Sequence, residues 1–170
     1  ELRSSALKLM QVIEGEKDPA FVETIIRMLT EKPLDEIVSS EEIQAKLEPI
    51  LKQHWETVEL IKDHSVAERG VVSFDLTGTG VDGYNKFIPY YFHPEVTYVV
   101  SLSQSSFRTK ISVGSNPWAP RPRTHNIAEI CERYGGGGHA VVGAVSLKPE
   151  ELELGQRYMN EIIEELQFED

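Results

Sequence analysis

The stretch Gly135-Gly136-Gly137-Gly138-His139 decides how the rest of this chain is interpreted. Consecutive glycines have no side chains to pack, cost backbone entropy, and let the main chain adopt positive φ or approach another group closely. Successive free N–H groups in such a turn form a concave donor array suited to phosphate or carboxylate oxygens. A histidine at the exit adds a donor whose charge changes near neutral pH. The stretch therefore predicts an anion-binding turn, with a flexible connector as the alternative.

Regular elements are predicted on both sides of the glycines. Upstream, Asn126 can cap a short helix, with Glu129 three residues further on, and Gly135 suits its left-handed C-terminal position. One face of that helix carries apolar residues at i, i+3, i+4 and i+7, namely Ile127, Ile130, Cys131 and Tyr134. Downstream, the apolar run 140–145 predicts a buried strand. The expected order is helix, glycine turn, histidine and buried strand.

The segment 126–143, NIAEICERYGGGGHAVVG, resembles the signature of the DHH-associated C-terminal domain of the DHH phosphoesterase family. The core GGGGH carries the likeness, which is closest over residues 107–147 and extends over 70–147. Valines at 141 and 142 stand where the family carries small alanines. The resemblance implies that residues 67–170 are this substrate-binding domain. Residues 1–66 would be a helical segment or linker, the tail of an N-terminal metal-binding domain.

The resemblance also implies an activity. Members hydrolyse phosphodiester or phosphoanhydride bonds in small nucleotides, oligonucleotides or polyphosphates, with catalytic manganese or magnesium held by the N-terminal domain. This chain lacks the Asp-His-His triplet of that domain, and its nearest string is Asp63-His64-Ser65. We therefore expect no catalytic or metal-binding residue here, and an N-terminal catalytic domain as partner. The chain begins with Glu1 rather than methionine, as a piece of a longer protein would.

Substrate-binding roles follow from the same resemblance for the glycine turn and for His139. His139 would contact a substrate phosphate, and the alternative is a histidine that only braces the loop. The family ends the preceding strand with Ser-x-Arg-Ser, and here the string is Ser112-Val113-Gly114-Ser115, so a glycine replaces the phosphate-gripping arginine. This departure puts the substrate class or the activity in doubt.

The predicted site also includes four residues that follow Gly114 in the chain: Ser115, Asn116, Arg121 and Arg123. Arg121 or Arg123, on the proline-rich loop, would fold back to supply the missing charge, or both are solvated loop arginines. Ser115 and Asn116 would donate to substrate or shape the turn before the proline that follows them. Trp118 on the same loop would stack on a base or cover a core edge.

Composition sets further bounds. The chain has 170 residues, 40% hydrophobic residues and a net charge of −11, which argues against general polyanion binding. Residues 107–133 hold five basic and two acidic side chains, a net charge of +3, so the remainder carries −14. Such a basic island suits a small anionic substrate better than a long nucleic acid. A single Cys131 allows no internal disulfide, which suits a reducing cytoplasm.

The remaining pattern predicts an α/β fold, a mixed β-sheet with flanking helices preceded by a helical segment. Ser39 and Glu42 predict a capping box for a long third helix, which Pro49 would kink or break. Earlier helices are expected over 2–13 and from Pro19 onward. In the second part, strands are expected at 71–76, 97–102 and 107–113, and helices at 84–92 and 150–167.

Other functions stay open at this point. A non-catalytic module that senses a nucleotide or phosphate is the main alternative. Gly78, Gly80 and Gly83 spell G-x-G-x-x-G after a predicted strand, which would suggest a dinucleotide-binding fold. The short helix that follows and the lack of an acidic residue about twenty positions on argue against it. No apolar run reaches membrane-spanning length, and a homodimer is one of the oligomeric states left open.

Overall fold

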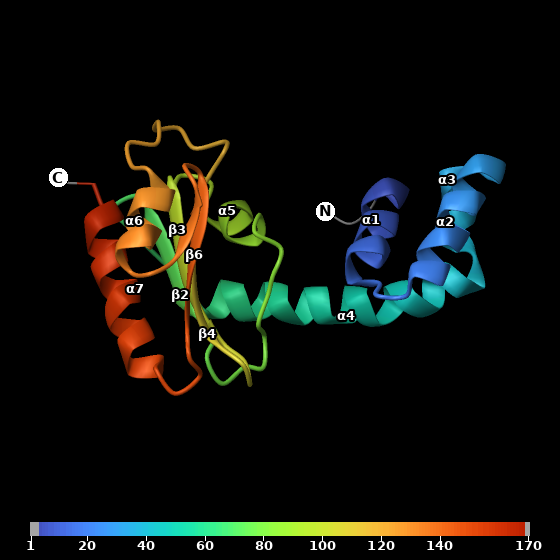
Figure 1. Cartoon of the computed structure of the whole chain (residues 1–170). Coiled ribbons are helices and arrows are strands. Elements are labelled where there is room, and N and C mark those ends of the chain that lie inside the picture. Colours follow the sequence, from blue (N-terminus) through green and yellow to red (C-terminus); the bar gives the residue numbers. More distant parts are fainter. Residues whose placement is uncertain (1–3, 169–170) are drawn as a thin grey trace. The chain divides into compact units, whose positions relative to one another are not determined.

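The computed structural model describes residues 4–168 and divides into two compact units, Glu1–Glu56 and Thr57–Asp170 (Figure 1). The first unit is helical, and the second contains one six-stranded mixed sheet with helices on both faces. The expected α/β class, a mixed sheet with flanking helices preceded by a helical segment, is therefore confirmed. Within residues 4–168, no helix combines the length and hydropathy that a bilayer span requires.

The helical unit contains α1 (Ser5–Gly15), α2 (Pro19–Glu31), α3 (Leu34–Ser39) and most of α4 (Glu41–His64). Asp18 caps α2 by accepting a hydrogen bond from the N–H of Ala20 at 3.0 Å, as the Asp-Pro pair predicts. The Glu16 carboxylate, between α1 and α2, accepts a hydrogen bond from the Lys46 ammonium at 2.7 Å. The helices enclose a small apolar core formed by Leu9, Val12, Ile25, Ile37, Val38, Ile43 and Leu47.

The cap expected at Ser39 is wrong, and of the kink or break expected at Pro49 the break does not occur. Ser39 does not cap α4, because it ends the short helix α3 and its hydroxyl donates to the carbonyl of Asp35. The chain then passes through Ser40 into α4. Pro49 does not break α4, which runs unbroken from Glu41 to His64. Proline removes one backbone hydrogen bond, and α4 nevertheless continues with fully buried apolar side chains on either side of it, Leu47 and Ile61.

The second unit is built on a sheet with the strand order β1-β2-β3-β4-β6-β5. Only β2 and β3 pair in parallel, and every other neighbouring pair is antiparallel. The strands are β1 (Val66–Glu68), β2 (Val71–Asp75), β3 (Tyr98–Gln104), β4 (Thr109–Ser115), β5 (Gly137–His139) and β6 (Val142–Leu147). The three central strands lie close to their predicted positions.

Helices cover both faces of the sheet (Figure 1). On one face, α6 (Ile127–Arg133) and α7 (Leu152–Leu166) pack against alternate residues of β3, β4 and β6. On the other face, α5 (Ile88–Phe92) and the end of α4 pack against β2 and β3. In β4 the buried residues Thr109, Ile111 and Val113 point to the first face, as the predicted alternation requires.

Three element predictions needed correction in their bounds. The helix expected at 84–92 shrinks to α5, since Pro89 is accommodated only in a first helical turn. The strand expected from residue 107 begins at Thr109, which leaves Phe107 65% exposed. The run 140–145 is not a buried strand: residues 140 and 141 form a turn, and β6 alternates between exposed and buried positions from Val142 onward.

Candidate functional site

The glycine run joins helix α6 to a β-hairpin: Gly135 and Gly136 form the connection, and Gly137 and Gly138 begin strand β5. Gly135 ends α6 with φ +78°, the left-handed conformation predicted for it. Gly136 lies against the backbone of β6, where an added Cβ would overlap the carbonyl oxygen of Ala144. Gly138 lies equally close to the carbonyl of Val142. The close backbone approach expected of the glycines is therefore found at these two positions, where two segments of the chain meet backbone to backbone.

Part of the expected donor array is already used within the fold. The N–H of Gly135 donates to the carbonyl of Glu132, and the N–H of Gly136 donates to that of Cys131. Both bonds satisfy the last carbonyls of α6. Gly137 and Gly138 pair with Ala144 and Gly143 in the hairpin. The glycines therefore position His139 on β5, an edge strand of the sheet.

Strand register places His139 beside the residue that replaces the family arginine. Val99, Gly114, Val142 and His139 are successive partners across β3, β4, β6 and β5, and we call them the His139 row. Partners in neighbouring strands point to the same face of a sheet. Neighbouring strands lie about 5 Å apart, so Gly114 and His139 are separated by about 10 Å. His139 is exposed at the end of this row.

The next positions on this face carry small side chains. Ser101, Ser112, Ala144 and Gly137 form the adjacent row, and Ser103, Lys110 and Ser146 form the one after it. Over β4, β6 and β5 these residues are half-buried or exposed. We call this part of the sheet, on the side of α5, the open face. Small residues allow a ligand to approach the backbone, and Lys110 contributes a positive charge.

Ser115 and Asn116 have different positions at the end of β4. Ser115 holds the carbonyl of Val141 with both its N–H and its hydroxyl, each at 3.0 Å. The buried Asn116 amide donates to the carbonyls of Pro94 and Val96, while its oxygen accepts from the N–H of Trp118. Asn116 thus shapes the turn, one of the two roles expected for it. Ser115 tethers the hairpin turn to β4.

The loop arginines are not brought together with His139. The Arg121 guanidinium stacks 5.1 Å from the ring centre of Phe168, which packs with α6 and α7 on the opposite face of the sheet. Arg123 donates to the carbonyl of His125 at 2.6 Å. Both side chains are exposed. In this arrangement neither arginine supplies the charge missing at Gly114.

Other conspicuous residues have structural surroundings. His125 contacts the hydroxyl of Tyr98 at 3.2 Å. Trp118 is 68% exposed and tilts against Phe87 with ring centres 5.3 Å apart. The G-x-G-x-x-G string forms turns and coil after β2, and no helix begins at Gly83. This disfavours a dinucleotide-binding loop, in which the helix begins at the last glycine.

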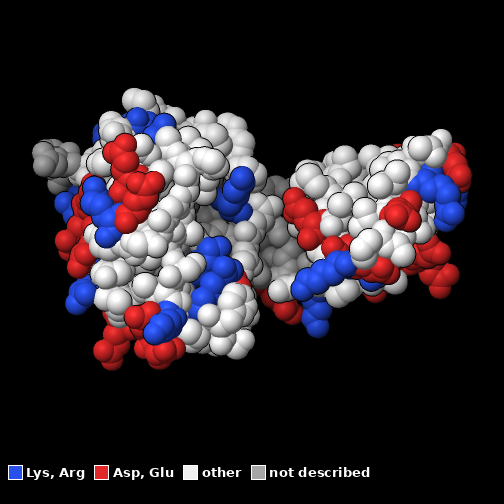
Figure 2. Space-filling view, viewed as in Figure 1, with Lys and Arg blue, Asp and Glu red and all other residues white. Residues whose placement is uncertain are grey.

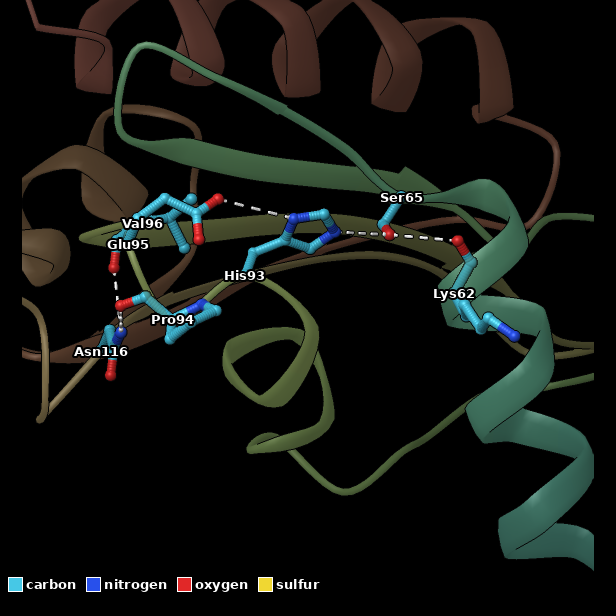
Figure 3. A network of polar contacts seen from close by, with 7 residues as sticks. All are labelled: Lys62, Ser65, His93, Pro94, Glu95, Val96 and Asn116. Atoms are coloured by element: carbon cyan, nitrogen blue, oxygen red, sulfur yellow. Dashed lines mark hydrogen bonds and ion pairs between the residues drawn. The ribbon is translucent and has the colours of Figure 1, made fainter.

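A serine, a histidine and a glutamate meet near the start of β1, at the sheet edge opposite β5 (Figure 3). Ser65 Oγ lies 3.0 Å from His93 Nε2, and His93 Nδ1 lies 3.7 Å from Glu95. Glu95 is mostly exposed and beyond hydrogen-bond range. The Ser65 hydroxyl also contacts the carbonyl of Lys62 at the end of α4. These contacts join the end of α4 to the segment before β3. The carbonyls of that segment also accept hydrogen bonds from the Asn116 amide. We therefore assign the Ser65–His93–Glu95 contacts a structural role.

The surface charges and the distribution of possible metal ligands limit what this unit can bind. Figure 2 shows acidic and basic side chains interspersed on the visible face, without one continuous basic surface. Among residues 4–168, no group of three or more His, Cys, Asp and Glu side chains could hold a metal ion. These residues therefore do not fit the catalytic metals of the family, and no reaction step is assigned to them through a metal.

No protein-family model and no curated protein matches the chain. Among solved structures, it resembles the pGpG-specific phosphodiesterase PggH from Vibrio cholerae with a TM-score of 0.70 and 21% identity, over 87% of this chain and 51% of that one. The DHH domain of a member of the s1p family of ribosomal proteins gives 0.47 and 11%, over 74% and 34%. An exopolyphosphatase-related protein from Bacteroides fragilis gives 0.44 and 14%, over 81% and 43%.

The first likeness shows a shared fold. This chain spans about half the length of PggH. The α/β fold implied by the signature of residues 126–143 is therefore also the fold found in a solved phosphodiesterase structure.

Proposed function

We propose that this chain is the substrate-binding part of a DHH-type phosphoesterase. It would bind a small phosphate-containing substrate on the open face, within a longer protein whose N-terminal domain holds the catalytic metals. The observation that carries the proposal is the His139 row. The GGGGH core ends in an exposed imidazole that shares one sheet face with small residues and with Lys110.

The chemistry of the open face agrees with a phosphate ligand. An exposed imidazole donates one or two N–H groups, and Lys110 adds a cation within the same sheet face. Gly137 and Ser112 leave little side-chain bulk between the ligand and the backbone. The net charge of the chain is −11, which disfavours long polyanions. A nucleotide, a short oligonucleotide or a short polyphosphate fits these properties.

The role of the chain in the reaction would be orientation. Holding a substrate in one geometry converts a bimolecular encounter into an effectively unimolecular step. His139 would fix one phosphate, and the rigid hairpin would limit its motion. The bond-breaking groups would come from the N-terminal domain, since residues 4–168 contain no metal-binding cluster. We therefore expect no hydrolysis by this chain alone, and manganese-dependent turnover of a dinucleotide by the purified chain would overturn that expectation.

A calorimetric titration tests the proposal. The ligands are pyrophosphate, AMP, a linear dinucleotide and a cyclic dinucleotide, measured with the wild-type chain and with His139→Ala. The linear dinucleotide is included because PggH is described as specific for pGpG. We expect at least one ligand to bind the wild type and to bind His139→Ala about tenfold more weakly, the loss typical of a hydrogen bond to a charged group. Absence of binding across the panel would contradict the proposal.

A phosphate-sensing module without catalysis is the alternative, and the glycine at position 114 favours it. Gly114 occupies the position where the family has its phosphate-gripping arginine. The coding sequence upstream of Glu1 distinguishes the two functions. An aspartate-rich segment with Asp-His-His supports the enzyme, and its absence supports the module.

A further inference from the structure

Tyr90 and Gly114 are matched to each other. Tyr90 lies in α5, and its ring packs into the apolar cluster between α5 and the sheet. A Cβ added at Gly114 would lie 3.0 Å from the Tyr90 hydroxyl oxygen and 3.1 Å from Val99. A side chain at position 114 would thus be tight, and Tyr90 or Val99 would have to shift by a few tenths of an ångström. The glycine that departs from the family pattern is the residue that admits this hydroxyl to the His139 row.

The Tyr90 hydroxyl has no hydrogen-bond partner within residues 4–168, although the residue is only 6% exposed. Two other tyrosines of this unit, Tyr84 and Tyr98, do have hydrogen-bond partners for their hydroxyls. Tyr84 pairs its hydroxyl with Ser101 at 2.8 Å, and Tyr98 accepts from the N–H groups of Thr124 and His125. The Tyr90 oxygen is not among the fully buried side-chain atoms that lack a partner, so it keeps a small exposed area, and it lies beside Gly114.

The Tyr90 hydroxyl lies beside Gly114, the second position of the His139 row, and His139 lies at the end of that row. Gly114 pairs with Val142, which pairs with His139, so the backbones of Gly114 and His139 are two strand spacings, about 10 Å, apart. The residue between them on this face is Val142, which is 42% exposed. A ligand with two phosphate groups, or with a phosphate and a ribose, can span such a distance along the open face.

We propose that the Tyr90 hydroxyl donates a hydrogen bond to a phosphate oxygen of the same ligand that His139 contacts. This inference rests on the proposed function. It assigns the site a ligand with two anionic or polar groups rather than a single phosphate. The donor is neutral, so its contribution is less sensitive to salt than that of an arginine.

Protonation of Tyr90 is compatible with this role. Burial, together with the neighbouring Tyr84, raises the pKa of the Tyr90 hydroxyl well above its ordinary value. The group therefore stays protonated at neutral and mildly alkaline pH, where it can donate to a phosphate oxygen.

The test compares Tyr90→Phe with a matched control, Tyr84→Phe, in titrations with pyrophosphate and a linear dinucleotide. Tyr84 lies in the same cluster, but its hydroxyl is already paired with Ser101. We expect Tyr90→Phe to weaken ligand binding about tenfold without lowering the melting temperature. Tyr84→Phe should lower the melting temperature, because it leaves Ser101 without its partner, and change the affinity less than twofold.

A third variant adds an independent readout. Gly114→Ala places a methyl group against the Tyr90 hydroxyl, so we expect it to weaken binding as well. The double variant Gly114→Ala with Tyr90→Phe should be no weaker than the worse single variant, because both changes remove the same contact.

The outcomes separate the two proposals. Wild-type affinity in Tyr90→Phe, with affinity lost in His139→Ala, overturns the role of Tyr90 and leaves the proposed function standing. No binding by the wild-type chain overturns both. Additive losses in the double variant would mean that Gly114 and Tyr90 act separately, which also contradicts the inference.

Discussion

The carbonyl oxygen of Ala144 occupies the space that a Cβ of residue 136 would need. Gly136 therefore joins the end of α6 to strand β6 through direct backbone contact. Its neighbour Gly135 meets no atom within 4 Å at the Cβ position and is special only in its φ of +78°. The glycines of one run thus serve different physical needs, and substitution can separate them.

Gly136→Ala should destabilise the sheet unit far more than Gly135→Ala. The first change forces two backbone segments apart, for which we expect a loss of about 3 kcal/mol. The second strains a left-handed residue in open space, for about 1 kcal/mol. Chemical denaturation followed by circular dichroism measures both. Equal losses of stability in the two variants would mean that the backbone near Gly136 can shift to accept a Cβ, and that its close approach to Ala144 does not limit stability.

Gly137→Ala probes ligand approach without disturbing the fold. No atom lies within 4 Å of its Cβ position, and the residue belongs to the open-face row that contains Ser112 and Ala144. We expect an unchanged melting temperature and several-fold weaker binding of pyrophosphate, since the methyl group stands between ligand and backbone. Unchanged affinity would place the ligand elsewhere on the face.

Asn116→Ala should destabilise the chain by about 2 to 4 kcal/mol, because the carbonyls of Pro94 and Val96 lose their donor and Trp118 N–H loses its acceptor. Asn116→Asp is the informative companion. It keeps the acceptor for Trp118 but directs a carboxylate at two carbonyl oxygens. Urea unfolding should rank wild type above both variants; a stable Asn116→Asp protein would show that the two donated bonds contribute little.

The buried thiol of Cys131 should lower the free energy of unfolding at alkaline pH. Burial raises the pKa of its thiol from 9.0 to about 11, so the folded chain retains a proton that the unfolded chain releases. The contribution of this group is complete below pH 9 and is lost as the pH rises through 11. We expect unfolding midpoints to fall over that window.

The control for the thiol is Cys131→Ala, which should flatten this part of the pH profile while lowering stability at every pH through the lost packing. Iodoacetamide offers a second measurement, because a buried protonated thiol should react much more slowly than the same thiol in denaturant. Rapid alkylation of the native chain at pH 8 would contradict the assignment.

Local rules of the chain predicted many of the elements well. Asn126 caps α6 by accepting from the N–H of Ala128, and Gly135 adopts the left-handed conformation that a helix end favours. The alternation of β4 also follows from sequence. These features depend on residues within one or two turns of each other, so a short window contains their cause. The same kind of local pattern gave a wrong prediction at Ser39, because the expected cap of α4 lies at the end of α3, a short helix that was not predicted.

The candidate site was predictable in part. The GGGGH core indicated His139, and the structure leaves that side chain exposed on a face of small residues. Arg121 and Arg123 were expected nearby because they follow β4 within ten residues. Phe168, from the other end of the chain, holds Arg121 on the opposite face, and no local pattern contains that information. Tyr90 was missed for a similar reason, since it is 24 residues from Gly114 in sequence.

The sequence by itself determined the caps of α2 and α6, the alternation of β4 and the GGGGH signature, because each depends on neighbouring residues. Only the tertiary structure decided the pairing of β4 with β6 and β5, which aligns Gly114 with His139. It also decided that a buried tyrosine would rest on that glycine. These contacts join segments far apart in the chain, and they arise from the packing of the whole sheet rather than from local preference.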